Sequence, residues 1–272
     1  MPMKPELISI REYDIEVYDN HQVSDDTILI FHWNSGSALS STKIFNTKLS
    51  RNNRIIVASL LGHGNSSKST DPQSEYSIAG VGRCIADIVK AYNLSKYWLV
   101  GQSISAHAIM ESYEIFPNCA GFVSVSAPPI SMNTLSEAFV ESPVSALLFK
   151  GDLSDQELGE VSKNFIEYDN NMDIVSSDFQ RTDPLFRLSL GASIAAGLVR
   201  DEISCVKKFQ FPSLFIRAEN DSFLSADYYR SLADVHSLKL NVTEIRGSGH
   251  AVFLDNIDEC SSIIENFIHE KH

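Results

Sequence analysis

One short segment in the middle of the chain limits the possible folds more than any other feature. The apolar run 97–100 is followed by the pentapeptide 101–105 (GQSIS) and then by the helix-like segment 106–113. This pattern predicts a buried strand, a sharp turn and a helix. In such a turn the hydroxyl group of Ser103 projects beyond the edge of the sheet, and the N–H group of Ile104 faces the same space. The pattern is typical of a nucleophilic serine.

The turn departs at one position from the pattern G-x-S-x-G that is common around nucleophilic serines. Ser105 occupies the place of the last glycine, whose small size lets the helix pack closely on the strand. Because serine is also small, the turn remains possible. Pentapeptides of this kind also arise by chance, so the hypothesis depends on finding catalytic partners for Ser103.

Two candidate partners follow the serine in the order that this type of site requires, the acid first and the base second. Asp221 comes soon after the apolar run 211–217, and His250 lies in a glycine-flanked loop after the strand-like stretch 238–245. We therefore predict that His250 takes the proton of Ser103 as a general base. The carboxylate of Asp221 would orient the imidazole and stabilise its protonated form.

Each partner also has an ordinary structural interpretation. Asp221 could be a turn residue that caps a helix beginning near Ser225, and Glu219 competes with it for the acid role. His250 could be a solvated loop histidine. The positions of the serine, the acid and the base after three predicted strands favour the catalytic interpretation. Histidines in polar or terminal surroundings are His21, His236, His269 and His272.

A site for acyl transfer also needs a second backbone donor for the oxyanion, and this donor normally comes from the loop after an earlier strand. The run 27–31 predicts that strand, and the segment 32–36 (HWNSG) is the loop. This loop resembles the His-Gly-x loop of the α/β-hydrolase family. By this resemblance the N–H groups of Asn34 and Ile104 would form the oxyanion hole, and His32 would brace the loop.

Trp33 occupies the position at which that family usually has glycine. If the backbone adopts a positive φ there, a tryptophan would cost about 1–2 kcal/mol. Since Trp33 lies next to the expected donor Asn34, we also expect it to contact the substrate. The segment 59–66 (SLLGHGNS) resembles a second loop of the family, in which we expect His63 to pack rather than to act as a base.

A narrower resemblance covers most of the chain. The motifs that carry it are the stretch His32-x-Asn-Ser-x-Ser, the loop 61–66 (LGHGNS), the pair 71–72 (DP) followed by 76–77 (YS), and the segment 126–129 (SAPP). Together with the acid and base loops, they are similar to the α/β-hydrolase type of N-acyl-homoserine lactone lactonase. The resemblance implies opening of the lactone ring of bacterial signals, known as quorum quenching, with no metal and no cofactor. It assigns Ser103 as nucleophile, His250 as base, Asp221 as acid, and Asn34 with Ile104 as oxyanion donors; Ile104 stands where an aromatic residue is usual.

Composition and charge are consistent with an ordinary globular enzyme. The 272 residues are 43% hydrophobic, enough for one large α/β domain, and the net charge of −13 argues against nucleic acid and anionic membranes as partners. No stretch is suited to spanning a bilayer and no signal peptide is evident, so we expect a cytoplasmic protein.

The expected partner is a small ester or lactone with an apolar acyl part; the oligomeric state stays open. Four scattered cysteines predict free thiols: Cys84, Cys119, Cys205 and Cys260.

The order of the elements predicts an α/β fold of the α/β-hydrolase type, with a mostly parallel twisted sheet and helices on both faces. Strands and helices alternate over 27–125, whereas the following stretch lacks strand-like runs until the acid strand. Its helix-like segments are 135–139, 155–161 and 185–190. We therefore predict a core domain formed by 1–129 and 206–272, and a helical cap, 130–205, inserted over the active site. The apolar cap would supply the walls of a substrate pocket.

Three functional hypotheses follow. The first is a hydrolase of lactones or carboxylic esters that acts through an acyl-enzyme. The second is another chemistry on the same scaffold, such as C–C bond hydrolysis or cofactor-free peroxidation, because a fold alone does not fix a reaction. The third is a ligand-binding or signalling protein with low turnover, which the bulk of Trp33 in the oxyanion loop would favour.

Overall fold

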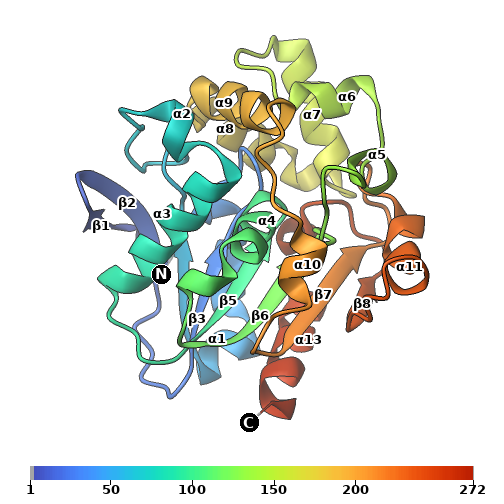
Figure 1. Ribbon diagram of the computed structural model, residues 1–272. Helices are drawn as coiled ribbons and strands as arrows, with labels where there is room; N and C mark the ends of the chain where they lie inside the picture. Colours follow the sequence, from blue (N-terminus) through green and yellow to red (C-terminus); the bar gives the residue numbers. More distant parts are fainter. Residues whose placement is uncertain (1–2, 272) are drawn as a thin grey trace.

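The computed structural model describes residues 3–271, and within them a single eight-stranded sheet lies at the centre of the molecule (Figure 1). The strands, in the spatial order β1-β2-β4-β3-β5-β6-β7-β8, have these bounds: β1 Glu6–Ile10, β2 Tyr13–Asp19, β3 Thr27–Phe31, β4 Arg54–Ala58, β5 Tyr97–Gln102, β6 Cys119–Val125, β7 Ser213–Ala218 and β8 Val242–Ile245. The pairs β1–β2 and β2–β4 are antiparallel, and the remaining pairs are parallel. The predicted mostly parallel sheet is therefore confirmed.

The central strands are short apolar runs because both faces of the sheet are covered. Every residue of β3 and β5 is buried. One face packs on α3 (Ile78–Ala91), α4 (Ile104–Glu111) and α11 (Ala226–Asp234). The helices of the opposite face are η1 (Ala38–Asn46), α1 (Lys48–Asn52), α12 (Val252–Asp255) and α13 (Ile257–Glu270). Parallel strands of this kind bring their carboxyl ends, and the loops that follow them, to one edge of the sheet.

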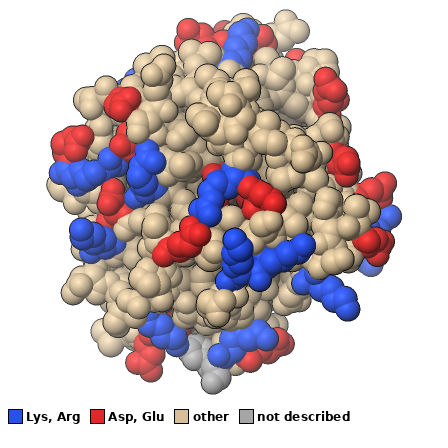
Figure 2. Space-filling model, viewed as in Figure 1, with Lys and Arg blue, Asp and Glu red and all other residues tan. Residues whose placement is uncertain are grey.

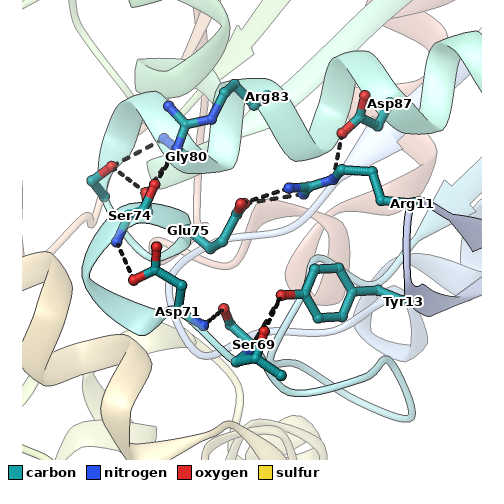
Figure 3. A network of polar contacts seen from close by, with 11 residues as sticks. Arg11, Tyr13, Ser69, Asp71, Ser74, Glu75, Gly80, Arg83 and Asp87 are labelled. Atoms are coloured by element: carbon teal, nitrogen blue, oxygen red, sulfur yellow. Dashed lines mark hydrogen bonds and ion pairs between the residues drawn. The ribbon is translucent and has the colours of Figure 1, made fainter.

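The N-terminal hairpin of β1 and β2 was not predicted from the sequence, although its apolar residues alternate as a half-buried strand requires. At its turn, Arg11 adopts a positive φ of 50°. The Arg11 guanidinium lies 2.5 Å from the Glu75 carboxylate and 2.9 Å from that of Asp87 (Figure 3). Because Glu75 belongs to α2 (Pro72–Glu75) and Asp87 to α3, these ion pairs attach the hairpin to the helices that cover the sheet.

The long connection between β6 and β7 is helical, as the sequence predicts, and most of it lies above the carboxyl ends of the strands (Figure 1). Its helices are α5 (Leu135–Ala138), α6 (Pro143–Leu147), α7 (Asp155–Phe165), η3 (Asp169–Asn171), α8 (Met172–Arg181), α9 (Pro184–Ala195) and α10 (Glu202–Val206). The predicted end of the cap at residue 205 falls inside α10, which packs against α4 beside the sheet. We call 130–201 the insertion; the division into a core and a cap domain remains a prediction.

Two features of the whole chain complete the description. Over residues 3–271 no helix is both long and apolar enough to cross a membrane, and all four cysteines are free thiols. On the face shown in Figure 2, acidic and basic side chains are interspersed over a largely uncharged surface.

Candidate active site

The predicted sharp turn connects β5 to α4 and places Ser103 between them. Ser103 has φ 55° and ψ −119°, a sparsely populated backbone conformation that surrounding contacts must hold. One such contact is the hydrogen bond of 2.9 Å from Ser103 N–H to the Val125 carbonyl of β6. Gly101 allows the helix to approach, because a Cβ atom there would lie 2.7 Å from the Cα of Ala106. The turn therefore presents Ser103, partly exposed, at the carboxyl edge of the sheet.

The serine that replaces the last glycine of the motif fits the turn. Ser105 is fully buried, and its hydroxyl donates to the carbonyl of His32 and, over 3.2 Å, to that of Gln102. Both bonds satisfy a hydroxyl that burial would otherwise penalise. Ser105 thereby ties the turn of the nucleophile to the loop that carries the expected oxyanion donor.

The structure brings the candidate acid and base together. Asp221, in the loop after β7, accepts a hydrogen bond of 2.8 Å from Nδ1 of His250 through Oδ2, and its Oδ1 accepts the N–H of Phe223 over 2.9 Å. Glu219, the alternative acid, instead accepts the N–H of Gly247 over 2.9 Å and so holds the backbone of the histidine loop. With Nδ1 occupied, Nε2 is the nitrogen of His250 left to act on Ser103, which lines the same cavity.

Further contacts fix the position of His250. Its carbonyl accepts hydrogen bonds from the Gln102 side chain, over 2.6 Å, and from the Ser126 hydroxyl, over 3.1 Å. Two aromatic rings pack against the imidazole in T-shaped arrangements. Their centroids lie 5.2 Å from it for Phe165 and 5.3 Å from it for Phe223. Since His250 is nearly buried, these rings limit the access of water to it.

The histidine loop is also joined to the insertion through backbone contacts. Ala251 N–H donates to the carbonyl of Phe165 over 2.7 Å, and the carboxylate of Asp255 accepts the N–H groups of Gly249 and Glu167, each over 2.9 Å. Gly249 has no room for a side chain, because a Cβ atom there would lie 2.9 Å from the Phe165 carbonyl oxygen. The loop of His250 and the end of α7 are thus one packed unit.

Asn34 and Ile104, the expected oxyanion donors, both line the cavity that contains Ser103. Within residues 3–271, neither backbone N–H group has a hydrogen-bond acceptor. Ile104 N–H is the first of α4, where the positive end of the helix dipole favours negative charge. The Asn34 side chain donates to the Leu148 carbonyl over 2.8 Å and accepts from Ser35 over 3.0 Å, which fixes its backbone.

Comparison with known proteins agrees with this geometry. A family model described as the alpha/beta hydrolase fold matches residues 26–147. The chain has the α/β-hydrolase fold. The expected resemblance to this family is therefore confirmed, whereas a search of the curated proteins found no match to the sequence.

Solved structures of similar fold include several enzymes that act on esters or lactones. The N-acyl homoserine lactonase AidH, complexed with N-butanoyl homoserine, has a TM-score of 0.87 at 19% identity and covers 99% of this chain and 97% of its own. An esterase from Exiguobacterium antarcticum has a TM-score of 0.75 at 14% identity, covering 97% and 98%. A membrane phospholipase A has a TM-score of 0.79 at 13% identity, covering 99% and 87%. At these identities the likeness establishes the fold.

Trp33 has a different position in this α/β-hydrolase fold from the one that the sequence suggests. Its indole is fully buried and packs against Phe165, with ring centroids 5.8 Å apart, and it is not among the residues that line the cavity. The expectation that Trp33 contacts substrate therefore disagrees with its position. The residue with positive φ in this loop is Ser35, at 64°. The backbone strain that a positive φ would cause at Trp33 is therefore absent. Gly36 leaves room for the indole, since a Cβ atom there would lie 3.0 Å from it.

His32 and His63 occupy packing positions, as expected for the loops that resemble the family. Nε2 of His32 accepts the N–H of Leu60 over 2.9 Å and Nδ1 donates to the Trp33 carbonyl over 2.8 Å, an arrangement that requires a neutral ring. Burial lowers the pKa of His32 to about 4. The His63 ring lies 4.7 Å from that of His32, and burial lowers its pKa as well.

The cavity beside Ser103 has a volume of about 510 Å³, within the range of small-molecule sites. Its walls come from the sheet edge, α3, α4 and the insertion. Apolar lining residues include Ile78, Ile130, Leu135, Phe139, Leu148, Phe149, Leu190, Ile194 and Val199. Sequence reasoning missed the polar lining residue His107, whose Nδ1 lies 2.9 Å from the buried carboxylate of Glu202. The position of His107, one helical turn after Ser103, was the available signal.

Proposed function

We propose that this protein is a serine hydrolase that cleaves carboxylic esters, including lactones, through an acyl-enzyme. The observation that supports this most directly is the 2.8 Å contact between Asp221 and His250, at the edge of the cavity that Ser103 lines. The acid, the base and the serine come from three different loops at one edge of the sheet. Such convergence is what nucleophilic catalysis requires and what a structural role for each residue would not need.

The reaction would proceed in two halves. The Ser103 oxygen attacks the ester carbonyl while Nε2 of His250 takes the hydroxyl proton, and the N–H groups of Asn34 and Ile104 bind the oxyanion. The imidazolium then protonates the leaving oxygen, which in a lactone stays attached to the acyl group. Water, deprotonated by His250, hydrolyses the acyl-enzyme, and Asp221 stabilises the imidazolium in both halves.

N-acyl-homoserine lactones are the substrate class that we propose. The apolar cavity would accept an acyl chain, and a lactonase for this class shares the fold over nearly the whole chain. A role in quorum quenching and a cytoplasmic location belong to the same proposal. The hypothesis of low turnover rests on the bulk of Trp33 in the oxyanion loop, but the buried indole packs against Phe165 and is not among the residues that line the cavity. No contact at the site specifically favours a different reaction.

The proposal is tested by product mass. The protein is incubated with a medium-chain N-acyl-homoserine lactone, and ring-opened acid and free fatty acid are followed separately. We expect ring-opened acid from the wild type, none above background from Ser103→Ala, and near wild-type formation from Ser262→Ala, an exposed serine in α13. Free fatty acid would show amide cleavage instead, and no product would contradict the lactonase proposal.

Covalent labelling separates the general from the specific part of the proposal. A fluorophosphonate should add to Ser103, detected by intact mass and peptide mapping, and should not add to Ser103→Ala. Labelling of Ser103 without lactone opening would leave a serine hydrolase with another ester substrate. An unmodified mass after long incubation would contradict the nucleophile itself.

A further inference from the structure

His107 is an unusual side chain to find in the wall of this cavity. It lies in the first turn of α4, four residues after Ser103, and its backbone N–H donates to the Ser103 carbonyl over 3.1 Å. Its side chain is 6% exposed and lines the cavity among apolar neighbours such as Ile130 and Phe139. A polar group in such a place costs free energy unless its hydrogen bonds are satisfied.

One nitrogen of the His107 ring is satisfied by a buried partner. Nδ1 lies 2.9 and 3.1 Å from the two carboxylate oxygens of Glu202, which is fully buried in α10. The same carboxylate accepts the N–H of Ile130 over 2.9 Å, so its position is fixed. Within residues 3–271, no partner occupies the other nitrogen, Nε2. Glu202 therefore holds the ring through Nδ1, and Nε2 is left to interact with a ligand in the cavity.

The protonation of this pair decides what His107 can offer. Burial lowers the pKa of His107, but the charge and hydrogen bond of Glu202 outweigh it and raise the pKa above 6.5; burial also raises the pKa of Glu202. This geometry favours one proton shared between Nδ1 and the carboxylate, in addition to the hydrogen on Nε2. Whether that proton lies on Nδ1 or on the carboxyl group, Nε2 keeps its own hydrogen. His107 thus presents a hydrogen-bond donor to the cavity.

The surrounding charges favour a neutral acceptor over an anion. Glu202 balances the charge of the imidazolium, and the buried Glu111, whose pKa is raised to about 7 mainly by burial, adds negative charge on the same side. Arg200 is the nearby cation, and its backbone N–H and guanidinium are engaged with Glu111 and Glu114. An anionic ligand group would therefore gain little attraction, whereas a carbonyl oxygen could accept the Nε2 hydrogen at no cost in charge.

We propose that His107 is a specificity-determining residue whose Nε2–H binds the carbonyl oxygen of an amide in the acyl part of the substrate. The inference rests on the proposed ester hydrolysis at Ser103. In an N-acyl amino ester or lactone, one carbon and one nitrogen separate the attacked carbonyl from the amide carbonyl. Ser103 and His107 are correspondingly close along the wall of one cavity, since only the first turn of α4 separates them.

The test compares two esters of equal length, p-nitrophenyl N-butanoylglycinate, which carries the amide, and p-nitrophenyl heptanoate, which does not. The measured quantity is the ratio of their kcat/KM values, each corrected for spontaneous hydrolysis. We expect the wild type to prefer the amide ester roughly tenfold, the effect of one good hydrogen bond. A merely structural role of His107 would change both values together and leave the ratio unaltered.

The variants are chosen so that the carboxylate of Glu202 is not left buried without a partner. His107→Leu combined with Glu202→Gln removes the donor but retains an acceptor for Ile130 N–H, and replacement of a buried pair by neutral groups is often tolerated. We expect this double variant to have a ratio near one. His107→Gln, which keeps a side-chain donor, should retain part of the preference. Ile194→Ala, in the same cavity, should lower both kcat/KM values and leave the ratio near that of the wild type.

A binding measurement makes the outcome independent of turnover. In the Ser103→Ala background, calorimetric titration with methyl N-butanoylglycinate and methyl heptanoate should give the same preference as a ratio of Kd values, again abolished by the double variant. An unchanged ratio in the double variant, in either assay, would overturn the inference. Selective binding without hydrolysis would support His107 while contradicting the proposed function.

Discussion

The histidines of this protein show how far a residue's chemistry depends on its partners. His250 faces a carboxylate in a loop, His107 faces a carboxylate inside the core, and both ring nitrogens of His32 bond backbone groups. The sequence indicates His250 because glycines and a preceding strand mark its loop. It gives no sign of the pair formed by His107 and Glu202, which are 95 positions apart and meet only through the packing of α10 on α4.

The neutral ring of His32 predicts a dependence of stability on pH. Its pKa is about 4 in the folded protein and near 6.5 in the unfolded chain, so the unfolded chain binds the proton more readily between these values. The free energy of unfolding should therefore be highest above pH 6.5 and should decrease as the pH falls toward 4, by roughly 3 kcal/mol from this residue. Urea unfolding of the wild type and His32→Gln from pH 7.5 to 4.5 measures the difference in slope.

The control for this prediction is His269→Gln, which removes an exposed histidine. Its unfolding curve against pH should run parallel to that of the wild type. If His32→Gln also gave a parallel curve, the low pKa of His32 would be wrong.

At the scale of elements, most of the sheet could be predicted because its central strands are apolar runs followed by turn residues. Two parts could not. The hairpin of β1 and β2 carries a weaker alternating pattern. Strand β8 begins at Val242 rather than at Leu238, whose N–H group instead bonds the carbonyl of Leu232 in α11. The sequence shows that Trp33 precedes Asn34, but it does not show the turn at Ser35 or the burial of the indole. The expectation of a pocket position for Trp33 is wrong for that reason.

A buried carboxylate links two elements that the sequence separates widely. Asp178 of α8 accepts the hydroxyl groups of Ser37 and Ser40, at the start of η1, over 2.6 and 2.5 Å. Burial raises the pKa of Asp178 to about 6, and these two hydrogen bonds offset only part of the shift. The contact attaches the insertion to the loop after β3.

The raised pKa of Asp178 makes stability depend on pH in the opposite direction to the lowered pKa of His32. Between pH 4 and 6 the folded protein binds the Asp178 proton more readily than the unfolded chain, so this residue should make stability decrease as the pH rises through that range. Asp178→Asn cannot titrate, and relative to the wild type it should gain up to roughly 3 kcal/mol of unfolding free energy between pH 4 and 7. Asp173→Asn, an exposed change in the same helix, should show no such gain; equal behaviour of the two variants would refute the assignment.

At the scale of the whole molecule, the cavity belongs to neither part of the chain alone. The sheet edge provides Ser103 and the proposed oxyanion donors, α4 provides His107, and the insertion provides most of the apolar wall. The sequence predicted that an apolar insertion would cover the site, but not which of its side chains face inward. That depends on how short helices such as α5 and α6 sit over the strands, and their sequences are too short to carry a clear periodicity.

The shape of the cavity predicts a preference for acyl chain length. Each methylene group buried on binding contributes about 0.8 kcal/mol, so kcat/KM should rise about fourfold per carbon until the chain reaches the end of the cavity. Ile194→Phe, at a partly exposed position of the lining, should shift the optimum to shorter chains without reducing hydrolysis of an acetyl ester. The matched change Leu198→Phe, outside the lining, should leave the optimum in place. A p-nitrophenyl ester series measures both, and identical profiles would contradict the assignment of the cavity.

The hydrogen bonds that join the His250 loop to the end of α7 limit how this protein could be re-engineered. Ala251 and Asp255 hold the insertion at Phe165 and Glu167, with Gly249 in direct contact. The insertion is therefore not an interchangeable module. A chimera that imports this region from a protein of similar fold would displace His250 unless the C-terminal loop 247–255 is imported with it, so the cavity wall and the proposed base would have to be exchanged together.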